Sequence, residues 1–221
     1  MSMPGSVEHS YAAELARKAI HLTSLSIPVV YFFITKETTL QILVPLALLF
    51  GAVDVARMFH EPTRRLFERY IDWLLRSHEL DTTSRRFNGA TYVLASATIC
   101  ILVFPKLIVL TAFSILIISD TFAALVGRRY GKHPFLKKSL EGTSAFFLSA
   151  LVVVAITPKI DYLPGEYIIG SIAALCGAII EALPVNIDDN LSIPVGVGAI
   201  MWLLYAVFLP TVNVFAFDAL R

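Results

Sequence analysis

Charged side chains are scarce in this chain. Only 16% of its 221 residues are Asp, Glu, Lys or Arg, whereas soluble domains average about 25%. Hydrophobic residues make up 57% of the chain, and its mean hydropathy is +0.73. This composition excludes an ordinary soluble domain and indicates a protein that resides in a lipid bilayer.

Cysteine is almost absent. The two cysteines, Cys100 and Cys176, both fall inside apolar runs, which excludes a disulfide framework and a zinc cluster. We expect both to be packing residues. The chain also lacks internal repeats, low-complexity tracts and linkers, so we expect residues 1–221 to form one integral membrane domain.

Seven apolar runs reach or approach the ~20 residues that are needed to cross hydrocarbon. They are Ala19–Ile34, Leu40–Val55, Gly89–Phe104, Leu107–Val126, Thr143–Thr157, Tyr167–Leu183 and Leu191–Leu209. No small-x-small cleavage site follows the first run, so we interpret it as a retained helix and not as a signal peptide. The sequence therefore predicts an all-α, polytopic membrane protein with about seven transmembrane helices.

The distribution of Lys and Arg predicts the orientation. If the N-terminus is cytoplasmic, the connections on that side hold 14 Lys and Arg residues, and those on the other side hold 4. Positive charge is enriched on the cytoplasmic side of membrane proteins. We therefore expect a cytoplasmic N-terminus and a C-terminus on the opposite side.

The only long connection is Arg57–Asn88. In it Pro62 suits a first helical turn, and apolar residues from Leu66 to Leu75 alternate with charged ones. This spacing predicts an amphipathic helix between the second and third transmembrane helices. It lies either in the headgroup region, with its arginines toward anionic lipid, or against the cytoplasmic face of the membrane domain itself.

Carboxylates at or inside the ends of apolar runs are costly, which makes them candidates for function. Under the predicted topology six of them approach the cytoplasmic side: Asp54, Asp120, Glu141, Glu181, Asp188 and Asp189. Three have simpler explanations, because Asp54 can pair with Arg57 on one helix face and Asp188-Asp189-Asn190 can form an acidic turn and helix cap. Asp120 and Glu181 are harder to explain structurally.

A basic loop joins Asp120 to Glu141. It contains Arg128, Arg129, Lys132, Lys137 and Lys138, and Arg17 and Lys18 approach the same side from the N-terminus. Acids and bases gathered together suggest a polyphosphate that Lys and Arg hold and that Mg²⁺ bridges to carboxylates.

Glycine and histidine add to this picture. We expect Gly127, Gly131 and Gly142 to let backbone N–H groups approach a phosphate or to take positive φ. Small residues at four-residue spacing on the fourth and sixth runs predict close helix contacts. His21, four residues after Arg17, is either a buried, hydrogen-bonding side chain, which we favour, or a general base.

Five segments together resemble the CTP-dependent lipid kinases, a family that covers dolichol kinase, phytol kinase and the CTP-using diacylglycerol kinase. The first two segments are Glu14-Leu-Ala-Arg17-Lys18-Ala-Ile-His21 and Arg86-Phe-Asn-Gly89-Ala-Thr91-Tyr92. The third and fourth are Ser119-Asp120-Thr-Phe-Ala-Ala-Leu-Val-Gly127-Arg-Arg-Tyr-Gly131-Lys132 and Lys137-Lys138-Ser139-Leu-Glu141-Gly142-Thr143. The fifth is Glu181-Ala-Leu-Pro-Val-Asn-Ile-Asp188-Asp189-Asn190.

The resemblance implies transfer of the γ-phosphoryl group of CTP to the hydroxyl of a membrane lipid alcohol: diacylglycerol, a polyprenol such as dolichol, or phytol. Because only the compact core of the family is present, it also implies a bacterial inner-membrane or organellar member with its active site at the cytoplasmic face. The expected partners are CTP, the lipid alcohol and the bilayer, with no nucleic acid. The expected cofactor is Mg²⁺.

On the resemblance and the chemistry of these residues we assign expected roles. The catalytic candidates are Asp120, Lys138 and Glu141. The nucleotide-binding candidates are Arg17, Lys18, Gly127, Arg128, Lys132, Lys137, Lys138, Gly142 and Thr143. The metal ligands are drawn from Asp120, Glu181, Asp188 and Asp189, and Asp120 either binds the metal or accepts the alcohol proton.

Two alternatives stay open on the sequence. A phosphatidate cytidylyltransferase would also use CTP and Mg²⁺ in a membrane, but it would release pyrophosphate. A small membrane transporter would also carry intramembrane charges. Against a transporter, the charges of this chain gather at one face.

Overall fold

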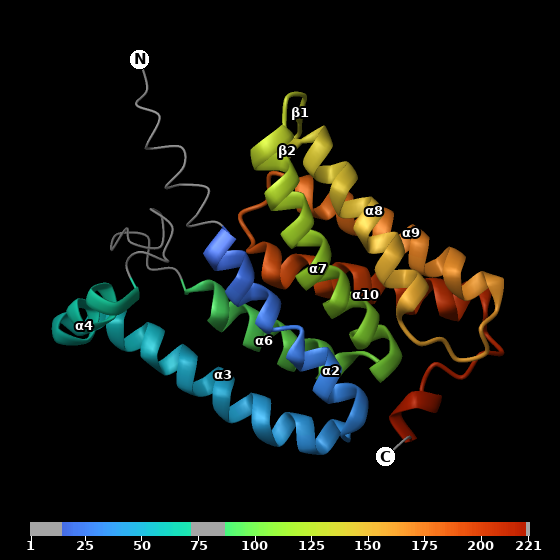
Figure 1. Cartoon of the computed structure of the whole chain (residues 1–221). Helices are drawn as coiled ribbons and strands as arrows, with labels where there is room; N and C mark the ends of the chain where they lie inside the picture. Colours follow the sequence, from blue (N-terminus) through green and yellow to red (C-terminus); the bar gives the residue numbers. More distant parts are fainter. Residues whose placement is uncertain (1–14, 72–86, 220–221) are drawn as a thin grey trace.

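The computed structural model describes residues 15–71 and 87–219, and these fold into a bundle of helices with one small hairpin (Figure 1). Residues 15–23 are helical. The elements that follow are α2 (Ser26–Phe33), α3 (Lys36–Phe59), α4 (Glu61–Ile71), α6 (Gly89–Val103), α7 (Lys106–Tyr130), β1 (Pro134–Phe135), β2 (Lys138–Ser139), α8 (Leu140–Ile156), α9 (Pro164–Ala182), α10 (Asp189–Phe208) and the 3₁₀ turn η2 (Ala216–Ala219).

In the described part of the chain, four helices are long and apolar enough to cross a membrane: α3, α7, α9 and α10. Helices α6 and α8 are apolar but shorter. This confirms an all-α membrane protein.

The first apolar run is not one continuous helix, because it breaks at residues 24–25. Pro28 has no N–H to donate to the carbonyl of Ser24. That carbonyl accepts instead from the N–H of Ile27, 2.9 Å away, in a tighter turn.

Helix α7 is the centre of the bundle. It packs against α8, α10, α2 and α6, and most of its length is buried. Its middle is apolar on every side, as in Ile115, Leu116 and Ile117, which are fully buried. A helix that is apolar all round belongs in a core. As a result, α7 carries Asp120 into the interior of the bundle.

Helix α3 lies at the edge of the bundle, against α6 (Figure 1). Large apolar side chains point outward from it, and Leu48 and Phe59 are both 69% exposed. A row of exposed aliphatic side chains on a long helix suits contact with lipid tails.

Helix α4 follows α3 after a break at His60. It begins at Glu61 with Pro62 in its first turn, as the sequence predicted, and Arg64 and Arg65 both pair with Glu61. The helix predicted in this connection is thus present. The part of this prediction that falls on residues 72–86 lies outside the described part of the chain.

The connection between α7 and α8 is a compact two-stranded hairpin. Pro134 pairs with Ser139 and Phe135 with Lys138, and Leu136 makes the turn with a φ of 50°. The Ser139 hydroxyl then accepts from the N–H of Gly142 at 3.1 Å and caps α8. The hairpin is therefore anchored at both ends to the helices that flank it.

Small residues allow the remaining helices to pack closely. A Cβ on Gly170 of α9 would lie 2.6 Å from Val154 of α8, and one on Gly177 would lie 2.8 Å from Val197 of α10. The predicted small-residue face on the sixth apolar run is thus confirmed as a packing face. It brings the end of α9, with Glu181, next to the start of α10, with Asp189.

Candidate functional site

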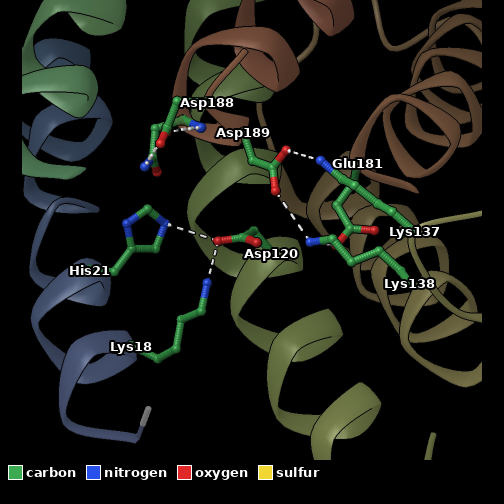
Figure 2. Close-up of polar contacts among 9 residues, drawn as sticks. Lys18, His21, Asp120, Lys137, Lys138, Glu181, Asp188 and Asp189 are labelled. Atoms are coloured by element: carbon green, nitrogen blue, oxygen red, sulfur yellow. Dashed lines mark hydrogen bonds and ion pairs between the residues drawn. The ribbon is translucent and has the colours of Figure 1, made fainter. Parts of the chain in front are cut away.

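Three carboxylates from three helices meet at one end of the bundle. Asp120 comes from the inner part of α7, Glu181 from the last turn of α9 and Asp189 from the first residue of α10. Each offers an oxygen, and these oxygens lie within 4.8 Å of one another (Figure 2). The sequence separates these residues widely, so only the packing of α7, α9 and α10 brings them together.

The hairpin adds two lysines to this group. The Lys138 ammonium lies 2.6 Å from Oε1 of Glu181 and 3.2 Å from Oδ2 of Asp189. The Lys137 ammonium lies 3.2 Å from Oδ1 of Asp189. The backbone N–H of Lys137 donates to the carbonyl of Ala182 at 3.1 Å, which fastens the hairpin to the end of α9.

The first helical segment supplies a third lysine. Lys18 is 5% exposed and donates to Oδ2 of Asp120. Nε2 of His21 lies 3.7 Å from the same oxygen (Figure 2). His21 was not among the predicted site residues. Its spacing of three from Lys18 on a helix, which puts both side chains on one face, was the available signal.

We call Asp120, Glu181, Asp189, Lys18, Lys137 and Lys138 the charge cluster. Its three carboxylates balance its three ammonium groups. Burial by itself would lower the pKa of Lys138, but Asp189 and then Glu181 outweigh it and raise the pKa above its ordinary value. Lys138 therefore stays protonated at neutral pH.

The donor set of the charge cluster fits a divalent cation such as Mg²⁺. Hard cations prefer carboxylate oxygens, and two ligands on opposite sides of Mg²⁺ stand about 4 Å apart. Oε2 of Glu181 is buried and has no hydrogen-bond partner among the described residues. A buried carboxylate oxygen left without a donor is costly unless a cation approaches it.

Two hydroxyls, like Oε2 of Glu181, are buried without a described hydrogen-bond partner. Oγ of Ser119 and Oγ1 of Thr143 are buried, and neither has a hydrogen-bond partner within the part of the chain that the structure covers. Thr143 was predicted to bind nucleotide, whereas Ser119 was predicted only as a small residue of a packing face.

Other predicted site residues lie apart from the charge cluster. Oδ1 of Asp188 accepts from the backbone and side-chain nitrogens of Asn190 at 2.9 and 2.8 Å, so this carboxylate caps α10. Glu141 accepts from Nδ1 of His133 at 2.7 Å and also from its backbone N–H. The alternative of an acidic cap is thus correct for Asp188 but not for Asp189.

The basic residues that were predicted to bind nucleotide also divide into those inside the charge cluster and those outside it. Arg128, Arg129 and Lys132 are exposed around the end of α7, and Arg17 is half-buried on the first helical segment. They surround the cluster side of the bundle without being part of the charge cluster itself.

Of the two roles expected for the loop glycines, positive φ is not found. No glycine in the described residues has positive φ. A Cβ on Gly142 would lie 3.0 Å from the carbonyl oxygen of Ala123 and 3.2 Å from Cα of Gly127. One on Gly131 would collide with the carbonyl oxygen of Gly127. Gly127 and Gly142 thus allow the close contact of α7 with α8, and Gly131 allows the end of α7 to lie against Ser139 of the hairpin.

Asp54 belongs to a separate, structural network. It is fully buried and accepts from Nε of Arg57 at 2.6 Å, from the backbone and side-chain nitrogens of Asn88 at 2.8 and 2.9 Å, and from Oγ1 of Thr91 at 2.7 Å. The pairing with Arg57 that we considered for this residue is confirmed. The additional bonds tie α3 to the start of α6.

Comparison with known proteins identifies relatives. The chain is 30% identical to CTP-dependent diacylglycerol kinase 1 of Schizosaccharomyces pombe over 165 residues, which cover 68% of this chain and 74% of that protein. It is 35% identical to dolichol kinase sec59 of the same organism over 89 residues, and 35% identical to probable phytol kinase 2 of Glycine max over 100 residues.

The last two matches cover 39% of this chain but only 17% of the dolichol kinase and 34% of the phytol kinase. No family model matches the chain, and no solved structure matches it. The match to the diacylglycerol kinase, which spans most of both proteins, nevertheless decides the family. The chain belongs to the CTP-dependent lipid kinases.

Proposed function

We propose that this protein transfers the γ-phosphoryl group of CTP to the hydroxyl of a membrane lipid alcohol and releases CDP. The observation that carries the proposal is the charge cluster, which gathers three carboxylates and three lysines at one end of an apolar bundle. Phosphoryl transfer asks a protein mainly for positioning and charge neutralisation, and such a group supplies both.

The roles follow from geometry. Asp120, Glu181 and Asp189 would hold Mg²⁺, which would supply positive charge against the negative charge that develops during transfer. Lys137 and Lys138, on the exposed side of the cluster, take the triphosphate together with Arg128 and Lys132 at the end of α7. Lys18 holds Asp120 in place from the first helical segment.

Residues around the cluster act on it indirectly. Glu141 positions the hairpin through His133, and the close packing at Gly127 and Gly142 sets the distance from α7 to the hairpin. The unpartnered hydroxyl of Thr143 points to a polar contact with bound substrate. Asp188 keeps Asp189 at the first turn of α10.

We further propose that seven segments cross the bilayer, with the N-terminus and the charge cluster on the cytoplasmic side, where CTP is found. Lys36 and Lys106, two of the four Lys and Arg residues counted on the opposite side, support this orientation. Lys36 donates to the carbonyl of Leu102 and Lys106 to that of Ile34, at the end of the bundle away from the hairpin (Figure 1).

A double-label experiment tests the reaction. Purified protein in detergent is incubated with Mg²⁺ and either γ-labelled or α-labelled CTP, in the presence of diacylglycerol, phytol, a polyprenol or, in a separate sample, phosphatidate. We expect label from γ-labelled CTP in a lipid monophosphate and CDP as the soluble product. Lipid labelled only from α-labelled CTP, with release of pyrophosphate, would identify a cytidylyltransferase instead.

The matched control in this assay is Asp120→Asn, which preserves the shape of the side chain. No labelled lipid from any alcohol with the unaltered protein would overturn the proposal. The panel also identifies the preferred alcohol, because the best acceptor is the one with the highest kcat/KM.

A further inference from the structure

Lys138 occupies the position that a cation would take between two carboxylates. Its ammonium is 2.6 Å from Glu181 and 3.2 Å from Asp189, and the carboxylate of Asp120 acts on it as well. The ammonium of Lys137 lies 3.2 Å from the other carboxylate oxygen of Asp189, Oδ1 (Figure 2). An ammonium and a divalent ion would therefore compete for the same oxygens.

The lysines can leave this position more easily than the carboxylates. The side chains of Lys137 and Lys138 are 29% and 33% exposed, whereas that of Glu181 is 3% exposed. Each lysine reaches the cluster on a flexible four-carbon stem from the hairpin, at its solvent side. Glu181 and Asp120 are fixed on the buried faces of helices.

Charge balance decides when a divalent ion can replace a lysine at these carboxylates. Three carboxylates already face three ammonium groups, so a divalent ion that enters alone adds charge to a neutral group and must displace a lysine into solvent. A triphosphate gives the displaced ammonium groups new anionic partners. The carboxylates then become available to the metal.

We propose, building on the function proposed above, that Lys138, assisted by Lys137, is an exchangeable counter-ion of the metal site. It neutralises Glu181 and Asp189 in the free protein and moves to the phosphates when nucleotide binds. Metal and nucleotide therefore bind as a coupled pair, and free divalent metal binds weakly. Linkage requires that each raises the affinity for the other by the same factor.

Metal titration of the protein without nucleotide tests this directly. Mn²⁺ binding is followed by electron paramagnetic resonance in detergent for the unaltered protein, Lys138→Gln, Lys138→Arg and Lys137→Gln. We expect Lys138→Gln to bind Mn²⁺ roughly tenfold more tightly than the unaltered protein, a size typical of coupling between sites. Lys137→Gln should give a smaller gain, because within the described residues the ammonium of Lys137 pairs with Asp189 but not with Glu181.

Two controls make the result specific. Lys138→Arg keeps the positive charge and should bind Mn²⁺ as weakly as the unaltered protein. Lys36→Gln removes a positive charge far from the cluster, where the side chain donates to Leu102, and should not change Mn²⁺ affinity. Each variant is first checked for a single elution peak and an unaltered thermal midpoint, so that misfolding is not mistaken for weak binding.

A second measurement follows the nucleotide. Binding of labelled CTP is measured by equilibrium dialysis with EDTA and with Mn²⁺, and the gain due to metal should be smaller for Lys138→Gln than for the unaltered protein. Mn²⁺ forms the same complex with CTP in solution whichever protein is present. A difference between the two proteins in the gain due to metal therefore reports on Lys138. Unchanged Mn²⁺ affinity in a folded Lys138→Gln protein would overturn the exchange.

The metal titration uses neither CTP nor lipid. It can therefore succeed or fail whether or not the chain phosphorylates an alcohol. If labelled lipid forms but Lys138→Gln binds Mn²⁺ no better, the exchange is wrong and the proposed function stands. If Mn²⁺ affinity rises but no lipid is labelled, the exchange stands and the proposed function falls.

Discussion

The ammonium of Lys18 is bound to the carboxylate of Asp120, 102 positions further along the chain. Lys18 is 5% exposed and Asp120 is 8% exposed, so each charge depends on the other for compensation. The pair joins the first helical segment to the central helix α7. It also holds one oxygen of Asp120 in place at the centre of the charge cluster.

Lys18→Met should destabilise the protein by about 3–5 kcal/mol, because it leaves the buried carboxylate of Asp120 without its main partner. The double variant Lys18→Met/Asp120→Asn should recover part of this loss, since neither charge is then left uncompensated. Thermal unfolding in detergent, arranged as a double-mutant cycle, measures the coupling. Strictly additive effects would show that the two side chains do not support each other.

Asp120→Asn should abolish phosphoryl transfer and lower the thermal midpoint, because the buried ammonium of Lys18 loses its carboxylate partner, while the bundle stays assembled. The amide keeps the size of the side chain but loses the negative charge that faces Glu181, Asp189 and the proposed metal. Turnover with labelled CTP and the thermal midpoint are measured on the same preparation. Wild-type turnover in this variant would remove Asp120 from the mechanism.

Asp54→Ala should mainly reduce stability and leave turnover near normal, whereas Asp120→Asn should mainly reduce turnover. Its carboxylate accepts from Arg57, Asn88 and Thr91, and it lies outside the charge cluster. We expect a loss of stability of about 3–5 kcal/mol, with near-normal turnover for the fraction that remains folded. Active-site titration normalises turnover to folded protein. A stable but inactive Asp54→Ala protein would contradict a purely structural role.

Gly142→Ala should destabilise the contact between α7 and α8 by about 1–3 kcal/mol. The added methyl group would meet the carbonyl oxygen of Ala123 at 3.0 Å, and a carbonyl in a helix cannot move aside easily. Gly51→Ala is the matched control, because nothing lies within 4 Å of its Cβ position on α3. Its thermal midpoint should be unchanged or higher, given the better helix propensity of alanine.

Glu141 gives a test of positioning against direct catalysis. Glu141→Ala removes the acceptor for the ring and backbone nitrogens of His133, which loosens the hairpin that presents Lys137 and Lys138. We expect KM for CTP to rise more than kcat falls. Glu141→Gln can still accept these hydrogen bonds and should restore most of the activity. Complete inactivity of Glu141→Gln would indicate that the charge itself takes part in the reaction.

Part of the site could be predicted because some patterns have a single physical meaning. A carboxylate inside an apolar helix must be compensated, so Asp120 and Glu181 were identified from their surroundings in the sequence. Lysines after such a helix, at the predicted cytoplasmic side, pointed to an anion. The long apolar helices α3, α7, α9 and α10 were located in the sequence for the same reason, since hydrocarbon requires continuous apolar stretches, although α3 extends four residues beyond the predicted run at each end.

Other features had two meanings that only packing could separate. Gly127 and Gly142 fit a phosphate loop and a helix contact equally well in the sequence, and the structure shows the close contact of α7 with α8 at these positions. Asp188 and Asp189 are adjacent and chemically alike. The start of α10 turned one toward Asn190 and the other toward Lys137 and Lys138.

The sequence by itself determined that this is a helical membrane protein, which residues are too costly to be incidental, and which family it resembles. Tertiary structure alone decided which of those residues meet. Asp120, Glu181 and Asp189 come from three separate helices, and Lys18 lies 102 positions from Asp120. Hydropathy and charge are local properties that can be read from neighbouring residues. The charge cluster depends on how α7, α9 and α10 pack, and that packing is set by side-chain shape across the whole bundle.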